Sequence, residues 1–235
     1  KGILMVISFA IFMFVFYKFI KHRIDVSNEK FVLVDGTKDA KLSSVITQDP
    51  KNENSITLYR SENQDKGIEF SYICWFLIND MHYKFGEWKH IFHKGNKSSY
   101  PNRAPGVFIH ESDNKIRIYM NSIKDILEYV DIDNIPLKKW VHLGVVLDGK
   151  YLDIYINGKL RTRYMMKGVP KQNFGDLWIN LFGGFDGYIS NLTYYRRALS
   201  YSEIDKVVKE GPSKKMLNQT KIKPPYLEDN WWFSN

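Results

Sequence analysis

The stretch from Lys139 to Met166 reads KWVHLGVVLDGKYLDIYINGKLRTRYMM, and its pattern decides the fold. It contains two dipeptides, Asp148-Gly149 and Asn157-Gly158, that favour tight hairpin turns because aspartate, asparagine and glycine tolerate positive φ. Between the two turns, apolar residues occupy every second position of 151–156, which is the period of a strand with one face on a core. The stretch therefore predicts a three-stranded antiparallel meander.

The same alternation extends over much of the chain, from about residue 31 to residue 193, without a sustained helical period. Residues 68–78, IEFSYICWFLI, are apolar on both faces and predict a central strand. Residues 106–122 predict two strands around a polar turn, and residues 176–182 predict another strand. The pattern is that of an all-β domain.

A glycine-rich stretch, GGFDGYISNLTYY, follows at residues 183–195. Its glycines are expected to bend the chain out of the preceding strand, with Asp186 shaping the turn beside them. Apolar residues at positions 189, 192 and 194 are spaced by three and then by two, which predicts a strand with a β-bulge.

One short helix is expected to close the domain. Ser200 and Glu203 have the spacing of a capping box at its start. Gly211 can end the helix in a left-handed conformation, and Pro212 prevents it from continuing.

An apolar segment, GILMVISFAIFMFVFYKFI, runs from residue 2 to residue 20 with only Ser8 and Lys18 as polar interruptions. About 20 mostly apolar residues are enough for a helix to cross a bilayer, so we expect a transmembrane anchor that contacts the lipid bilayer through residues 2–20. Lys18, Lys21 and Arg23 flank the end of this span, where their charged groups reach the headgroups. By the positive-inside rule, the rest of the chain is expected on the cytosolic side of a single-pass membrane protein.

The cysteine count and the distribution of charge limit the compartments and partners that we expect for this protein. The only cysteine, Cys74, excludes an internal disulfide and favours a reducing compartment. The formal net charge is +8, of which residues 1–30 carry +3 and residues 211–235 carry +2, so only +3 is left for the residues between them. A nucleic-acid binder would carry its basic stripe on the folded domain, and we therefore expect no nucleic-acid partner.

The C-terminal segment, residues 213–235, reads as an extended polar linker that ends in aromatic residues. Exposed aromatic residues usually mark a contact, so the segment is expected either to fold back onto the domain or to dock into a neighbouring protein. The candidate partner-binding residues are Pro224, Pro225, Tyr226, Trp231, Trp232 and Phe233.

Four segments, GIEFSYICWFLI, WKHIFHKGN, DNIPLKKWVHLGVVLDGKYLDIYINGK and GGFDGYISNLTYYRRALSYSEI, together resemble the laminin G-like branch of the concanavalin A-like lectin/glucanase superfamily. The resemblance covers roughly residues 55–212 and is closest to versions encoded by large double-stranded DNA viruses. It implies an all-β, concanavalin A-like jelly-roll sandwich of two antiparallel sheets, and a role in adhesion, glycan binding or assembly. We therefore divide the chain into a membrane anchor with a basic flank (1–23), a linker with the first edge strand or strands (24–54), the sandwich (55–212) and the tail (213–235).

The sequence lacks the carboxylate pattern of a glucanase active site. A glucanase of this superfamily would carry an E-x-D-x-x-E pattern whose carboxylates project from one strand. Here Glu111 and Asp113 have the first spacing, but Ile116 occupies the third place, and Asp131 and Asp133 precede a proline-containing loop. We expect no catalytic residues and no enzyme activity.

The histidines and aspartates are the candidate metal ligands. The histidines lack zinc-type spacing, and His90 and His93, three residues apart, are expected on opposite faces of a strand. Because many laminin G-like domains hold calcium at a rim, Asp148, Asp176 and Asp186 are the candidate ligands, although each also suits a turn or the start of a strand. No other cofactor is expected.

Glycan binding stays open, because lectins stack sugar rings on exposed aromatic side chains. The tryptophans lie in strands and are expected in the core, so the candidates for glycan stacking are Tyr151, Tyr155, Tyr194 and Tyr195. Our leading hypothesis is a non-enzymatic, membrane-anchored structural protein, a minor capsid component that links an internal viral membrane to capsid proteins. The alternative is a membrane-tethered carbohydrate-binding module.

Overall fold

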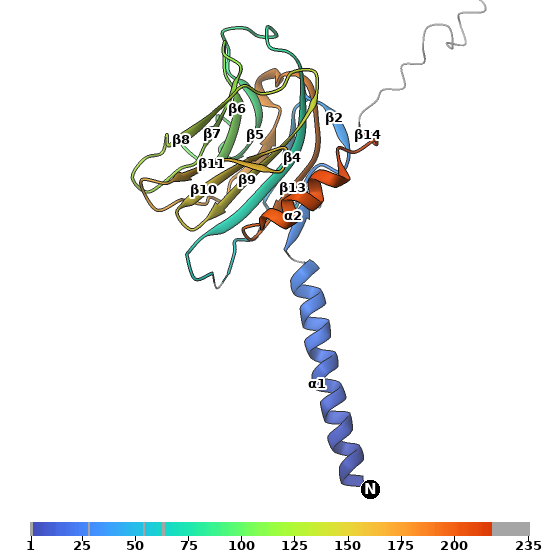
Figure 1. The fold of residues 1–235 in the computed structure, drawn as a ribbon. Helices are drawn as coiled ribbons and strands as arrows, with labels where there is room; N and C mark the ends of the chain where they lie inside the picture. The colour runs from blue at the N-terminus through green and yellow to red at the C-terminus, as the bar shows by residue number, and fades with distance from the viewer. Residues whose placement is uncertain (1, 28, 54, 63, 218–235) are drawn as a thin grey trace, which may run out of the picture.

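The computed structural model describes the backbone of residues 2–27, 29–53, 55–62 and 64–217, and the side chains of these residues except 2–6 and 21–27. The described residues form an N-terminal helix, a β-sandwich of two sheets and a second, short helix (Figure 1). The all-β sandwich expected from the sequence is confirmed.

The larger sheet, sheet A, has the strand order β11-β10-β9-β4-β13-β2-β14, and β1 also pairs with β13. Neighbouring strands are antiparallel except β14, which runs parallel to β2. The strands are β1 (Lys30–Val32), β2 (Thr37–Asp39), β4 (Glu69–Asp80), β9 (Trp140–Asp148), β10 (Tyr151–Ile156), β11 (Lys159–Met165), β13 (Asp186–Tyr195) and β14 (Met216–Leu217).

The smaller sheet, sheet B, has the strand order β3-β12-β5-β6-β7-β8 and is antiparallel throughout. Its strands are β3 (Ser44–Ile46), β5 (Lys89–Gly95), β6 (Arg103–Ile109), β7 (Lys115–Tyr119), β8 (Tyr129–Asp133) and β12 (Asp176–Ile179). The three short strands β1–β3 lie in the segment 24–54, and they contribute to both sheets.

The core lies between the two sheets and explains the alternation in the sequence. On β4, Phe70, Cys74 and Phe76 face the core, whereas Ile73 belongs to a second buried cluster on the outer side of sheet A. The central position of β4, between β9 and β13, is confirmed, and so is the meander of β9, β10 and β11.

The glycine-rich stretch connects β12 to β13 through a short 3-10 helix, η1 (Leu181–Gly183). The expected β-bulge in β13 is confirmed, because the register with β4 shifts between Ser190 and Thr193, and Asn191 has a φ of 51°. A Cβ on Gly187 would lie 1.8 Å from the Leu77 carbonyl oxygen, so only glycine fits where β13 begins.

The second helix, α2 (Tyr201–Glu210), covers part of the outer side of sheet A (Figure 1). Its capping box is confirmed, since the Ser200 N–H donates to Glu203 Oε2 at 2.9 Å, and it ends at Gly211, whose φ is 74°. Ile204 of α2 is fully buried against the second cluster, which contains Ile73 and Tyr155. This part of the outer side of sheet A is therefore covered by the protein itself.

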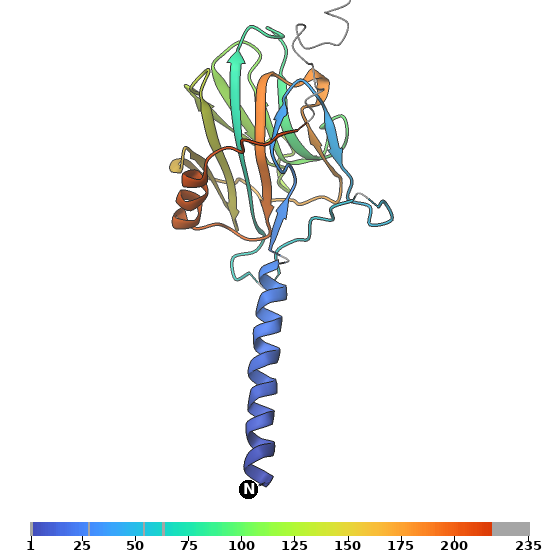
Figure 2. The same cartoon turned by 90° about the vertical axis from the view of Figure 1, so that its right-hand side faces the viewer.

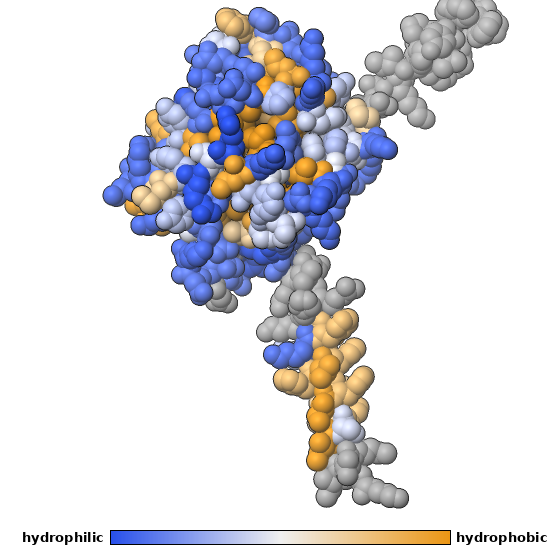
Figure 3. Space-filling view, in the orientation of Figure 1, coloured by the Kyte–Doolittle hydropathy of each residue, from blue (hydrophilic) through white to orange (hydrophobic). Residues whose placement is uncertain are grey.

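The first helix, α1 (Gly2–Ser27), extends away from the sandwich (Figures 1 and 2). Its described side chains, Ile7–Ile20, are mostly apolar and all exposed, as Figure 3 shows. In the described part of the chain, no helix combines the length and apolar character that a membrane crossing requires. The transmembrane helix expected over residues 2–20 is thus not found there, and the side chains of Lys21 and Arg23 lie outside the described residues.

Candidate functional site

The outer side of sheet B carries a group of aromatic and arginine side chains that no described α-helix covers. Strict alternation in β7 and β8 buries Ile116, Ile118, Val130 and Ile132 in the core. The intervening residues of both strands therefore face outward. We call this surface the aromatic face; it consists of Trp88, Arg103, Phe108, Arg117, Tyr119, Tyr129, Asp131 and Trp178.

Arg117 is the centre of the aromatic face. Its Nε and Nη2 donate to the two carboxylate oxygens of Asp131 at 2.6 and 2.7 Å, across the β7–β8 pair. The guanidinium carbon lies 3.7 Å from the ring centroid of Tyr129 and 4.9 Å from that of Trp88. Hydrogen bonding to Asp131 raises the pKa of Arg117 above its already high ordinary value. The ion pair and the two rings thus form a rigid polar and aromatic platform.

A second arginine lies beside this platform. The guanidinium carbon of Arg103 is 3.5 Å from the ring centroid of Tyr119, which in turn lies 5.8 Å from the ring of Tyr129. Tyr129 is 45% exposed, so its ring is open to a ligand. The two arginines and the two tyrosines form one continuous patch over β6, β7 and β8.

Two histidines lie under one end of the aromatic face, and here the sequence-based expectation is wrong. A register irregularity between His90 and Phe92 turns His90 and His93 to the same side of β5, where His90 Nε2 and His93 Nδ1 are 2.6 Å apart. The Leu181 N–H donates to His90 Nδ1 at 2.9 Å, so His90 Nε2–H donates to His93, and His93 Nε2–H donates to the Asn96 carbonyl at 2.7 Å.

Burial keeps both histidines neutral in this chain of hydrogen bonds. It lowers the pKa of His93 to about 4 and that of His90 well below its ordinary value, with His93 adding to the effect on His90. Both side chains are fully buried. The pair therefore stabilises the loops at the end of β5 and is not a metal site open to solvent.

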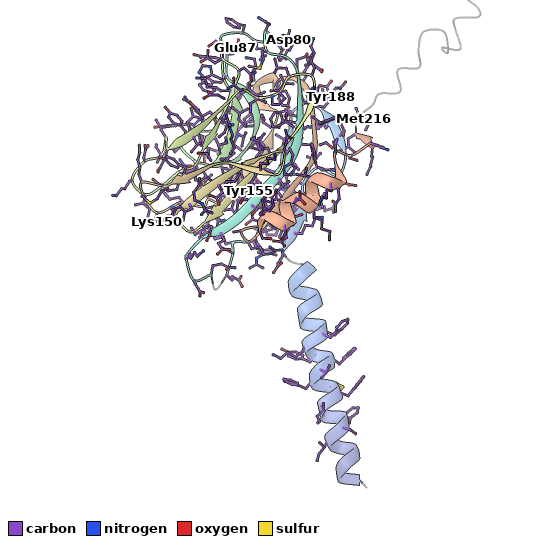
Figure 4. The ribbon with its side chains drawn as sticks, in the orientation of Figure 1. Asp80, Glu87, Lys150, Tyr155, Tyr188 and Met216 are labelled. Atoms are coloured by element: carbon purple, nitrogen blue, oxygen red, sulfur yellow. The ribbon has the colours of Figure 1, made fainter. Side chains whose placement is uncertain are left out.

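The tyrosines that the sequence suggested for glycan stacking lie elsewhere. Tyr194 is in the core, and its hydroxyl donates to the Tyr59 carbonyl at 2.7 Å. Tyr155 is 7% exposed on the side of sheet A that α2 crosses (Figure 4), and Tyr195 packs partly buried against the same cluster. Tyr151 is 42% exposed, with Arg163 over its ring. The expectation that these four residues share a wet surface is corrected, because α2 and the core cover three of them.

The three calcium candidates are also separated: Asp148 and Asp186 lie beside opposite ends of β4, and Asp176 belongs to sheet B. Asp148 binds Lys66 at 2.9 Å and Asp186 binds Lys41 at 2.5 Å, while Asp176 accepts the Gln48 N–H at 2.9 Å. Within the ranges that the structure describes, no three histidine, cysteine, aspartate or glutamate side chains gather as a metal site would need. Calcium binding at these residues stays a prediction.

The remaining candidates are placed as follows. The partner-binding residues of the tail, 224–233, lie outside the described residues. Cys74 is buried in the core, as expected for a small apolar residue, and burial raises the pKa of its thiol to about 12. Glu111 lies in the turn between β6 and β7, and the Asp131 carboxylate is held by Arg117.

The described residues also line two kinds of opening. A cleft of about 440 Å³ lies between β8 and the β10–β11 hairpin, with Ile132 and Leu160 in its wall and Asp133, Lys159 and Arg161 around it. A smaller groove of about 190 Å³ runs between β13 and α2. Neither opening lies on the aromatic face.

Sequence reasoning missed the aromatic face, although part of the signal is present. The segments KIRIY and YVDID alternate strictly, so Arg117, Tyr119, Tyr129 and Asp131 all face away from the core. That the two strands pair, with Arg117 opposite Asp131, is a matter of register that the sequence of each strand does not contain. Trp88 and Trp178, expected in the core, are half-buried on this outer side.

Comparisons with known proteins agree with this architecture. A family model of the concanavalin A-like lectin/glucanases superfamily matches residues 50–205. No curated protein matches the chain.

Solved structures with a similar fold include receptor-binding domains of botulinum neurotoxins. The binding domain of serotype D has a TM-score of 0.53 at 14% identity, and the match covers 77% of this chain and 46% of that one. The serotype D ligand-binding domain in complex with N-acetylneuraminic acid has a TM-score of 0.53 at 14% identity, with 78% and 42% covered. The receptor-binding domain of the C/D mosaic serotype has a TM-score of 0.51 at 16% identity, with 61% and 36% covered.

This chain spans less than half the length of each of these toxin domains, and at such low identity the likeness is one of fold. The family match, in contrast, covers more than half of this chain. The chain belongs to the concanavalin A-like lectin/glucanases superfamily.

Proposed function

We propose that the sandwich is a carbohydrate-binding module and that the saccharide lies on the aromatic face of sheet B. The single observation that carries the proposal is the arrangement of Arg117 between Trp88 and Tyr129 with its bidentate partner Asp131. Sugar rings have apolar C–H faces and polar rims, and this platform offers aromatic rings and fixed polar groups side by side.

The polar groups of the platform are already oriented. Asp131 uses both carboxylate oxygens to accept hydrogen bonds from Arg117, and each oxygen keeps a further lone pair for a hydroxyl donor. Because the ion pair fixes the side chains before a ligand arrives, little conformational entropy is lost on binding. The family includes lectins, and one structural neighbour is a toxin domain in complex with N-acetylneuraminic acid, which is consistent with this choice of ligand.

The test is a glycan array probed with the full chain in detergent, followed by titration of the best saccharide into variants. Tyr129→Ala removes an exposed ring from the platform and is expected to weaken binding at least tenfold. Tyr201→Ala removes a ring of similar exposure, 59%, from α2 and is expected to leave binding unchanged. Equal effects of the two variants, or no bound saccharide at millimolar concentration, would overturn the proposal.

A second candidate is the assembly role, in which the protein links a viral membrane to capsid proteins. It is supported by the exposed apolar side chains of α1, among them Phe9, Phe12 and Phe19 at 64%, 62% and 58%, which need an apolar partner. The sequence of the tail, with its adjacent aromatic residues, adds to it. The anchor, the cytosolic placement of the domain, the position in a virion and the absence of enzyme activity stay predictions from the sequence.

Crosslinking mass spectrometry on producing membranes tests the assembly role. Crosslinks from Lys214, Lys215, Lys221 and Lys223 to a coat protein are expected if the tail holds a partner. Crosslinks confined to this chain would count against it.

A further inference from the structure

We propose that the saccharide on the aromatic face carries a single carboxylate and that Arg103 holds this group above the ring of Tyr119. The inference rests on the proposed function and narrows the ligand from any saccharide to an acidic one, such as a sialic or uronic acid.

The charges of the aromatic face do not balance. Arg117 is neutralised by Asp131, at 2.6 Å. Arg103, in contrast, forms no ion pair with any residue that the structure describes, and its Nε is buried without an acceptor. A partly buried cation without a counter-ion costs free energy, and an anionic ligand group would offset that cost.

The position of Arg103 is fixed by its neighbours. Its backbone N–H donates to Asn121 Oδ1 at 2.5 Å, and the Asn121 amide donates in turn to the carbonyls of Pro101 and Ile126 at 3.0 and 2.6 Å. Asn121 itself is 3% exposed. A buried amide thus ties the start of β6 to the β5–β6 loop and to the β7–β8 loop, and it fixes the backbone of Arg103.

The side chain of Arg103 is fixed as well. It crosses the sheet over Gly106, where the absence of a side chain leaves room for it, and its guanidinium stacks 3.5 Å from the ring centroid of Tyr119. Stacking leaves the edge of the planar guanidinium free for a carboxylate. Burial lowers the pKa of Arg103, whereas the hydrogen bonds to Asp131 raise that of Arg117, in line with a counter-charge beside Arg117 and none beside Arg103.

The chemistry favours one carboxylate over a polyanion. A nucleic acid or a highly sulfated chain needs a row of cations, but next to Arg103 the face offers a second arginine that Asp131 has already neutralised. Arg103, which has no ion-pair partner among the described residues, lies near the exposed ring of Tyr129, on which a sugar can stack. This arrangement suits a saccharide with a single acidic group.

The test compares matched saccharides and matched variants of the full chain in detergent. The probes are 3′-sialyllactose against lactose, and glucuronic acid against glucose, each titrated by calorimetry. The acidic member of at least one pair is expected to bind at least tenfold more tightly than the neutral member. Arg103→Gln is expected to reduce that preference to twofold or less.

Arg161→Gln is the control, because Arg161 is an exposed arginine on β11, away from the aromatic face. It is expected to keep the full preference. If acidic and neutral saccharides bind equally to the wild type, or if Arg103→Gln keeps the preference, the inference falls while the proposed function stands. If no saccharide binds at all, both fall.

Discussion

The side chain of Arg103 packs against Gly106: a Cβ built on Gly106 would lie 3.3 Å from both Cβ and Cδ of Arg103, and 3.2 Å from Cε2 of Phe108. The glycine thus leaves room for Arg103 beside Phe108, where the guanidinium reaches Tyr119. A residue with no functional group of its own shapes the proposed binding face.

This relationship predicts that Gly106→Val displaces Arg103 from Tyr119. Gly106 does not have a positive φ, so valine meets a steric contact and no backbone strain. We expect the preference for an acidic over a neutral saccharide to fall at least fivefold, with a stability loss of about 1 to 2 kcal/mol. Binding is measured by calorimetry and stability by urea unfolding. An unchanged preference would show that Arg103 does not depend on Gly106.

A second prediction concerns the Arg117–Asp131 pair, for which the chain contains a matched control. Arg163 makes the same bidentate contact with Asp153, at 2.7 and 2.6 Å, on sheet A. Lysine keeps the positive charge but cannot make the two parallel hydrogen bonds to the carboxylate or stack on an aromatic ring as a guanidinium does. Arg117→Lys and Arg163→Lys are each expected to cost about 1 kcal/mol of stability, but only Arg117→Lys weakens saccharide binding, by at least fivefold. Equal loss of binding in both variants would indicate a global effect.

A third prediction is that acid destabilises the sandwich through its buried histidines. His142 is fully buried beside Trp75, and neither of its ring nitrogens has a partner among the described residues; burial lowers its pKa to about 4. Below pH 6.5, His142 binds a proton in the unfolded chain but stays neutral in the native protein. The free energy of unfolding therefore decreases as the pH falls from 6.5 towards 4. The same sign holds for His90 and His93.

The measurement is urea unfolding of the sandwich at pH 7 and pH 4.5, followed by tryptophan fluorescence. His142→Phe is expected to reduce the loss of stability between these pH values by about 2 to 3 kcal/mol. His82→Phe is the control, since the His82 side chain is 84% exposed, and should leave the loss unchanged. An identical loss in wild type and His142→Phe would contradict the assignment.

A fourth prediction separates steric contact from backbone strain at glycines. A Cβ at Gly187 would lie 1.8 Å from the Leu77 carbonyl oxygen, whereas a Cβ at Gly86, with a φ of 82°, would meet nothing within 4 Å. Gly86→Ala is expected to cost about 1 kcal/mol from strain alone. Gly187→Ala must also move β13 from β4 and is expected to cost about 4 kcal/mol or more. Similar melting temperatures for the two variants would show that β13 shifts without penalty.

Local patterns in the sequence were enough to predict much of the fold. The two turn dipeptides predict the β9–β11 meander, and the spacing of Ile189, Leu192 and Tyr194 predicts the bulge in β13, because both depend on neighbours in the chain. The capping box of α2 is likewise local. The two-residue strand β14 was not predicted, since its pairing with β2 depends on a contact between residues about 180 positions apart.

The candidate site could be predicted only in part, for two physical reasons. Alternation tells which residues of β7 and β8 face outward, but the pairing of Arg117 with Asp131 depends on register. The irregularity in β5 reverses the side on which His90 lies relative to His93, and no residue of that strand signals it. Tyr155 was misplaced because α2 returns over sheet A and buries a position that alternation alone leaves exposed.

The most direct test of saccharide binding on the aromatic face is a residue-resolved map of where a saccharide binds. Backbone amide and indole signals of the full chain in detergent micelles would be followed by NMR while 3′-sialyllactose is added. Shifts are expected at Trp88, Tyr119 and Tyr129 on the outer side of sheet B, with Trp75 and Trp140 of sheet A unchanged. Shifts confined to sheet A, or none at millimolar saccharide, would contradict it.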